Sequence, residues 1–279
     1  MAAVVLATVC AVVYGTADFF GGLATRRSRV LAVVVLSQIV GLVLVVALLP
    51  FLPGTLTTGT LAWGMASGLA GSAGLVLFYR ALATGVMSVV APLTATASAI
   101  LPVLFGLATG ERPEPVALGG VVLALLAVLL VSRSSSPAAT AGRSYGSILT
   151  SLAAGAGFGG FFILLSQAPE DGGIWPLLGA RLASVTLIAL LALVTRRSLH
   201  PGSGALRIII AAGALDMIAN VLFILAQQRG LLSLVAVLVS LYPASTLLLA
   251  RYVLGERLNT VQVVGIGFTL AAVALIAAG

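Results

Sequence analysis

The chain has 279 residues, of which 61% are hydrophobic and only 8% are charged. A soluble domain has about 25% charged residues, so this composition cannot cover a surface that faces water. The formal net charge of +7 does not indicate a nucleic-acid partner, because such proteins gather basic residues on one soluble face. Here most of the basic residues lie in short breaks between apolar runs. Composition therefore excludes a soluble protein and predicts one whose solvent is the lipid bilayer.

Apolar runs of the length that crosses a bilayer, about 20 helical residues, recur along the whole chain. In chain order they predict helices at 2–24, 31–52, 60–83, 87–109, 115–132, 146–167, 174–195, 205–228, 232–254 and 261–278. Backbone polar groups in lipid must be bonded internally, which permits helices or a closed barrel. The runs lack the alternation of barrel strands. We therefore predict an all-α integral membrane protein with ten transmembrane helices.

The two halves of the chain resemble each other. At an offset of 145 residues, Gly110-Glu111-Arg112 aligns with Gly255-Glu256-Arg257, and both triplets end the fourth predicted helix of their half. We expect a first five-helix repeat at 1–132, a central cytoplasmic linker at 133–145 and a second five-helix repeat at 146–279. Because five is odd, the second repeat enters the membrane from the opposite side. Inverted repeats of this kind allow alternating access in many secondary transporters.

These features resemble the drug/metabolite transporter superfamily, specifically its EamA-type branch. The resemblance rests on the Gly-Glu-Arg turns and the Gly-containing helices after them (Gly110–Val131 and Gly255–Ala278), on the five-plus-five layout, and on the first-helix segment Tyr14–Gly22. It covers essentially the whole chain. It implies a carrier of the bacterial inner (plasma) membrane, often an exporter of amino acids, metabolites or toxic compounds, with a central cavity shared by both halves.

The arginines are distributed unequally between the two sides of the predicted bundle. We name the side of the N-terminus side A and the opposite side side B. Side A receives Arg112 and Arg229, whereas side B receives Arg26, Arg27, Arg29, Arg80, Arg133, Arg143, Arg196, Arg197, Arg207, Arg251 and Arg257. Positive residues of short loops stay cytoplasmic, so we expect side B to be cytoplasmic and both termini to be extracytoplasmic. Some relatives of the branch place their termini inside, which leaves the opposite orientation open.

Ionisable groups inside a membrane span are costly and are therefore functional candidates. Asp216 lies near the midplane, and Asn220 and Gln227 follow it on the same helix face. Asp216 could carry the proton that drives antiport, or it could form a structural hydrogen bond or ion pair. Arg181, the arginine that lies deepest in a predicted helix, could pair with Asp216, hold a substrate carboxylate or reach out towards side A.

The other acid within a predicted helix is Asp18, which lies nearer side B and one helical turn after Tyr14. It could gate or relay a proton at the inner mouth, or pair with Arg26 or a neighbouring helix. Polar side chains on other predicted helices complete the set of substrate-binding or coupling candidates, and these are Gln38, Tyr79 and Tyr242. Proline permits a kink, so Pro243 in the ninth predicted helix could act as a hinge.

Several short motifs have simpler interpretations. Gly155-x-Gly157-x-x-Gly160 matches a dinucleotide fingerprint, but no βαβ unit surrounds it, so we interpret it as small-residue helix packing. The single histidine, His200, and the single cysteine, Cys10, lie far apart, so we expect no metal site and no cofactor. Glu111-Arg112 most simply marks the water boundary and a local ion pair, with a gate latch as the alternative.

The function that these observations favour is secondary active transport. We expect a proton-coupled exporter of a small metabolite, amino acid or drug-like compound, with protons, a small-molecule substrate and the lipid bilayer as its partners. An enzyme acting on lipids would need His, Asp or Cys clustered near one interface, which this sequence lacks, so we expect no enzyme activity. The alternative is a lipid flippase or an auxiliary membrane subunit with the same fold.

Overall fold

The computed structural model describes residues 1–84, 87–131, 145–196, 199–202, 204–255 and 258–279, without the side chains of 79, 82–84, 87–89, 91, 92 and 145. The first half contains α1 (Ala2–Thr25), α2 (Val30–Leu48), α3 (Thr58–Thr84), α4 (Met87–Ala108) and α5 (Pro115–Val131). The second half contains α6 (Tyr145–Ser166), the 3-10 turn η1 (Glu170–Gly172), α7 (Trp175–Val194), α8 (Ala205–Gln227), α9 (Leu232–Val239), α10 (Tyr242–Val253) and α11 (Thr260–Ala278).

The helices have the length and hydropathy of membrane spans. Among the described residues, eight segments qualify by both measures, and two shorter apolar helices are Leu93–Ala108 and Pro115–Val131. Large apolar side chains such as Val43, Leu193 and Leu270 are exposed on their surfaces. Exposed apolar surface on this scale suits a lipid solvent, in which the helical backbone satisfies its own polar groups. The prediction of an all-α membrane protein is confirmed.

The predicted span at 232–254 agrees with the apolar segment Leu232–Val253, but it is not one continuous helix, because the chain turns at Ser240 and Leu241 and forms α9 and α10. Pro243 has no N–H to donate to the carbonyl four residues earlier, and its ring disfavours helical geometry at the preceding residue. The Leu241 N–H bonds to the carbonyl of Leu238, which closes the last turn of α9. The other predicted helices begin and end within four residues of the observed ones.

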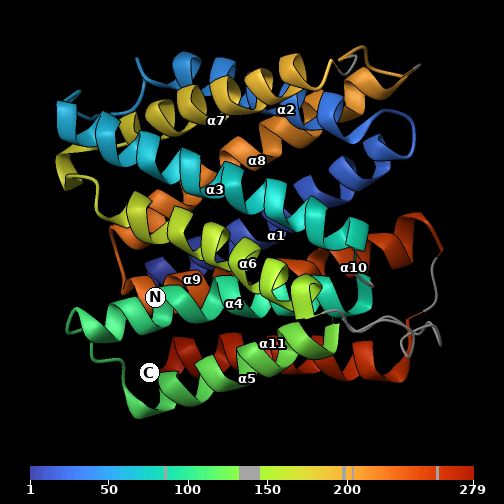
Figure 1. Cartoon of the computed structure of the whole chain (residues 1–279). Coiled ribbons are helices and arrows are strands. Elements are labelled where there is room, and N and C mark those ends of the chain that lie inside the picture. Colours follow the sequence, from blue (N-terminus) through green and yellow to red (C-terminus); the bar gives the residue numbers. More distant parts are fainter. Residues whose placement is uncertain (85–86, 132–144, 197–198, 203, 256–257) are drawn as a thin grey trace.

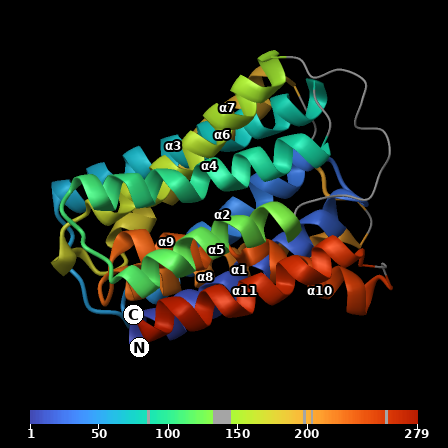
Figure 2. The same cartoon turned by 90° about the horizontal axis from the view of Figure 1, so that it is seen from below.

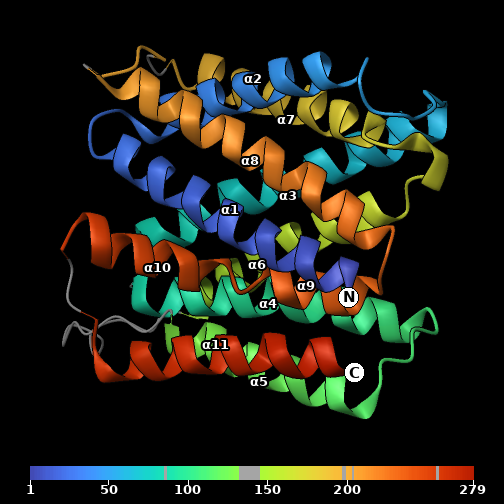
Figure 3. The ribbon, with the colours of Figure 1, turned by 180° about the vertical axis from the view of Figure 1, so that it is seen from behind.

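The spans form two layers, and each layer takes helices from both halves of the chain. In one layer neighbours contact in the order α7, α3, α6, α4, and α3, α6 and α4 face the viewer in Figure 1. In the other the order is α2, α8, α1 and α9–α10, and α8, α1 and α10 face the viewer in Figure 3. α2 contacts α7 at one edge of the two layers, and α5 contacts α11 at the opposite edge. Both termini lie at the same end of the helices, which is side A (Figure 1).

Small residues bring neighbouring helices of a layer into close contact. A Cβ atom at Gly157 of α6 would lie 2.5 Å from the Gly74 Cα of α3, and one at Gly68 would lie 2.2 Å from the Ala180 carbonyl oxygen of α7. Close backbone approach of this kind is how membrane helices gain packing energy without a hydrophobic driving force. A Cβ atom at Gly155 would lie 2.6 Å from the Thr94 carbonyl oxygen of α4, so the glycine motif of α6 is a packing surface.

The layers are packed more tightly on side A than on side B. α9, on the side A half of the ninth span, is buried along nearly its whole length, whereas Ala244 is the one buried side chain of α10, on the side B half. Figure 2 shows α6 leaning away from α1 and α10 towards side B. On α1, Ala7 and Ala11 are buried, but Asp18 further along the same face is exposed. Side chains of α1 and of the ninth span are therefore more fully buried towards side A than towards side B.

Candidate functional site

Arg181 is the centre of a polar cluster that joins α7, α2 and α8. Its guanidinium forms an ion pair with the Asp216 carboxylate and donates a hydrogen bond to Gln38 Oε1. The Arg181 side chain is 9% exposed and that of Asp216 is 38% exposed. A charged side chain is buried so fully only when a countercharge compensates it. The structure thus brings together three residues that the sequence singled out separately.

The position of Arg181 depends on a glycine of α2. A Cβ atom at Gly41 would lie 3.1 Å from Arg181 Nε and 3.3 Å from its Cζ. Gly41 follows Gln38 by one helical turn, so one face of α2 offers both the space for the guanidinium and an acceptor for it. Sequence reasoning missed Gly41, because one glycine among 32 carries no signal of its own.

Ser184 and Asn220 extend the cluster. The Ser184 hydroxyl lies 3.2 Å from the Arg181 carbonyl oxygen and 3.4 Å from Gln38 Oε1. Asn220 Nδ2 donates to the Asp216 carbonyl oxygen at 2.7 Å and lies 3.4 Å from its Oδ2. Asn220 is buried, and its Oδ1 accepts no hydrogen bond from the described residues. Because buried polar atoms are nearly always bonded, this oxygen is available to a donor that enters the site.

A second polar group adjoins the first on α1 and α10. The ring centroids of Tyr14 and Tyr242 lie 6.4 Å apart, and Asp18 follows Tyr14 by one turn of α1. The Cys10 thiol, one turn before Tyr14, donates to the Ala219 carbonyl oxygen at 3.1 Å, so this face of α1 lies against α8, the helix that carries Asp216. Asp18 makes neither the ion pair with Arg26 that the sequence allowed nor any other ion pair or hydrogen bond within the part of the chain that the structure describes.

One predicted site residue, Gln227, does not join the cluster. Gln227 lies eleven residues beyond Asp216 on α8, about 16 Å towards side A. Phe223, between them on the same face, is fully buried and packs against Phe162 with ring centroids 4.6 Å apart. The Tyr79 side chain lies outside the described residues. No group of three or more His, Cys, Asp or Glu side chains that could hold a metal occurs among the residues described.

Glu111 follows the end of α4, where the sequence placed the water boundary, and it also links the two halves of the chain. Its carboxylate accepts hydrogen bonds from the backbone N–H groups of Leu232 at 2.7 Å and Ser233 at 3.0 Å. These are the first two residues of α9, where free N–H groups and the helix dipole favour a negative charge. A Cβ atom at Gly106 would lie 2.3 Å from Glu111 Oε2, so the carboxylate is held between α4 and α9. The matching Glu256 lies outside the described residues.

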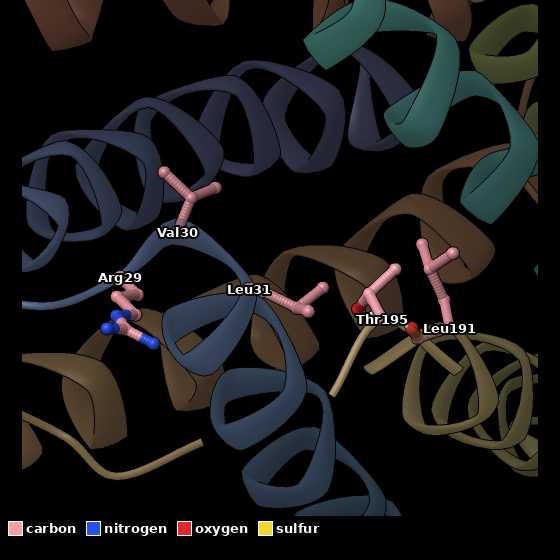
Figure 4. Close-up of a pocket in the computed structure, with 5 residues that line it drawn as sticks. All are labelled: Arg29, Val30, Leu31, Leu191 and Thr195. Atoms are coloured by element: carbon pink, nitrogen blue, oxygen red, sulfur yellow. Dashed lines mark hydrogen bonds between the residues drawn. The ribbon is translucent and has the colours of Figure 1, made fainter. Parts of the chain in front are cut away.

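A separate pocket of about 450 Å³ lies at the side B ends of α2 and α7 (Figure 4). It is lined by Arg29, Val30, Leu31, Leu191 and Thr195. Leu191 is ten residues from Arg181 along α7, a distance of about 15 Å, so this pocket is distinct from the polar cluster. The Thr195 hydroxyl donates to the Leu191 carbonyl at 2.7 Å, which leaves Arg29 as the one charged group of a mainly apolar lining.

Comparison with known proteins identifies related sequences and a related fold. The family model of the EamA-like transporter family matches the chain twice, at residues 1–133 and 146–278. One solved crystal structure is 18% identical in sequence and superposes with a TM-score of 0.76, covering 96% of this chain and 95% of that chain. At this identity the likeness shows the fold alone. No curated protein sequence matches the chain.

Proposed function

Because the chain belongs to the EamA-like transporter family, we propose that it is a secondary active transporter that exports a small metabolite, amino acid or drug-like compound in exchange for protons. The observation that carries the coupling step is the ion pair between Arg181 and Asp216. It lies inside the membrane-spanning bundle and joins α7 to α8, and Gln38 extends it to α2. Ionisable pairs at this depth are characteristic of proton pathways in transporters.

The arrangement of the helices supports an inverted repeat of ten spans. In such a repeat α1 is equivalent to α6, α2 to α7, α3 to α8, α4 to α9–α10 and α5 to α11. Exchanging these partners turns the order α7, α3, α6, α4 of one layer into α2, α8, α1, α9–α10, which is the order of contacts in the other layer. Rocking of one set of helices against the other would then expose the site alternately to the two sides.

Protonation of Asp216 provides a physical switch for this movement. While the carboxylate is charged, it neutralises Arg181 and ties α7 to α8. When it takes up a proton, the ion pair is lost, and a buried guanidinium without a countercharge costs several kcal/mol. Arg181 must then find another partner, for instance an acceptor on the substrate, and α8 is free to move relative to α7. Release of the proton restores the pair.

The arginine distribution supports a bacterial inner-membrane location with side B in the cytoplasm. Arg26, Arg29 and Arg207 lie at side B ends of α1, α2 and α8, and positive residues stay on the cytoplasmic side. Both termini are then extracytoplasmic. In this orientation the exposed carboxylate of Asp18 lies on the cytoplasmic half of α1, the side from which an exporter takes up its substrate.

The test is uptake of a panel of metabolites, amino acids and drug-like cations into proteoliposomes with an imposed pH gradient. We expect the wild type to move at least one compound in a gradient-dependent way. Asp216→Asn should lower the gradient-driven rate about tenfold or more, and Glu114→Gln, which removes an exposed charge in a loop, should leave it unchanged. Unaltered gradient-driven uptake in Asp216→Asn would overturn the coupling role. Flipping of a labelled phospholipid without movement of any soluble compound would favour the flippase instead.

A further inference from the structure

Asp18 is exposed on a face of α1 that is otherwise directed inwards. The outer face of α1 is marked by Val5, Val9 and Val12, which are exposed and repeat at helical spacing. Asp18 lies on nearly the opposite side of the helix, in line with the buried Ala7. Its exposure is therefore to the space between the layers, and the lipid does not reach it. It lies two turns from the side B end of α1.

Two tyrosine rings lie beside this carboxylate, and their place is fixed by close helix packing. Tyr14 precedes Asp18 by one turn on the same face, and its ring lies 6.4 Å from that of Tyr242 with a 54° angle between the planes. The start of α10 is held against α1, because Thr246 Oγ1 donates to the Gly15 carbonyl oxygen at 2.9 Å. A Cβ atom at Gly15 would lie 2.3 Å from the Tyr242 carbonyl oxygen.

The break between α9 and α10 adds partial negative charge to the same region. α9 ends at Val239, three residues before Tyr242, and contacts α1 as α10 does. The C-terminal end of a helix carries a partial negative charge, and Pro243 cannot donate an N–H to the Val239 carbonyl. The C-terminal ends of interrupted membrane helices bind cations in other transporters. The partial negative charge at the end of α9 therefore has the same sign as the carboxylate charge of Asp18.

Among the residues that the structure describes, no cationic side chain pairs with this site. Arg181, the buried cation nearest to it, is committed to Asp216 and Gln38, and Asp18 contacts no cation among the described residues. An uncompensated carboxylate inside a membrane span is costly, and the faces of aromatic rings attract cations. From these observations we propose that Asp18, Tyr14 and Tyr242 bind the positively charged group of an organic ammonium compound. The inference rests on the proposed transport function and adds the chemical class of its substrate.

The proposal is tested by calorimetric titration of the purified full-length protein with phenyltrimethylammonium, whose charge is permanent, and with its neutral isostere tert-butylbenzene. We expect saturable binding of the ammonium and none of the isostere. Asp18→Asn should weaken binding about tenfold or more, whereas Asp18→Glu, which keeps the charge, should weaken it only a few-fold. Glu114→Gln removes an exposed loop carboxylate and should change nothing.

The aromatic contribution has its own matched pair of variants on α10. Tyr242→Leu removes a ring of the site and should weaken binding about threefold or more, whereas Tyr252→Leu removes a ring that is 81% exposed at the helix end and should have no effect. Elution volume and helical circular dichroism report whether each variant is folded. If Asp18→Asn does not fold, Asp18→Glu and Tyr242→Leu still decide the outcome.

Two results would overturn the cation site without contradicting the transport function. A third result would support the cation site and contradict the transport function. Absence of saturable ammonium binding, or binding that Asp18→Asn and Tyr242→Leu do not weaken, would remove the cation site. Gradient-driven uptake of a neutral or anionic compound that Asp18→Asn leaves unchanged would remove the substrate class while supporting the transporter. Binding of the ammonium with no flux of any compound would support the site and contradict the transport function on which it rests.

Discussion

The α1–α8 and α3–α6 interfaces occupy matching places in the two layers, yet their chemistry differs. Between α3 and α6 the backbones meet at Gly74 and Gly157, and this interface serves packing. Between α1 and α8 lie Asp216 and Tyr14. At the repeat offset of 145 residues, Asp216 stands where the first half has Gly71. The comparison teaches that both halves of the chain form the same helix arrangement. The ionisable side chains, however, occur at the α1–α8 interface, and glycines take the matching place at the α3–α6 interface. Fold alone therefore does not locate the site.

The largest expected effect is on the packing interface. Gly157→Leu would place a side chain where even a Cβ atom lies 2.5 Å from the Gly74 Cα, and overpacking of this kind costs about 3 kcal/mol or more when backbone opposes backbone. We expect the variant to lose most of its folded fraction after heating, as measured by size-exclusion chromatography. Gly119→Leu, at a position with no atom within 4 Å of the added Cβ, should behave like the wild type. Equal stability of the two variants would contradict the packing role of α3–α6.

A smaller effect on stability is expected at the polar interface. Arg181→Leu leaves Asp216 without its countercharge, but because Asp216 is 38% exposed the loss should be about 2 kcal/mol, below the 3–5 kcal/mol typical of a fully buried pair. The double variant Arg181→Leu/Asp216→Leu should regain most of that stability, because an apolar pair replaces an ion pair at little net cost. A thermal-melting cycle of the four proteins measures this. Additive losses in the double variant would contradict the ion pair.

The smallest effect is expected at the contact between the halves. Glu111→Gln removes the negative charge at the start of α9 but keeps an acceptor for the Leu232 N–H, so it should cost about 1 kcal/mol or less. The shift in melting temperature should shrink at high salt, because a charge near the membrane surface is screened. Glu114→Gln in the same loop serves as the control. A salt-independent shift would indicate that Glu111 acts by packing, without its charge.

Much of the fold could be predicted from the sequence, because a span of apolar residues in lipid has few alternatives to a helix. The break at Ser240 and Leu241 could not be, although Pro243 was visible. α4 carries Pro102 and remains continuous from Met87 to Ala108, so a proline does not by itself end a membrane helix. Whether the helix is interrupted depends on local tertiary contacts, here the hydrogen bond between the start of α10 and α1. The sequence pattern of one helix does not show such a contact.

The candidate site could also be predicted in part from the sequence. Asp216, Arg181 and Asp18 stand out because ionisable groups are rare and costly in a span. The helical stripe from Asp216 to Gln227 was a poorer guide, since a stripe fixes a helix face but not the depth at which a partner meets it. The α9 residue that Glu111 contacts lies 121 residues away. Such long-range partners depend on the order of helices in the layers, which hydropathy does not encode.

Coupling between the solute and the proton is tested most directly by the reverse experiment to gradient-driven uptake. Proteoliposomes hold a trapped pH-sensitive dye, no pH gradient is imposed, and a transported compound from the uptake panel is added outside. We expect the internal pH to change with the solute gradient in the wild type and in Glu114→Gln, and to stay constant in Asp216→Asn. Solute uptake without any pH change in the wild type, or an undiminished pH change in Asp216→Asn, would contradict proton coupling through the Arg181–Asp216 pair.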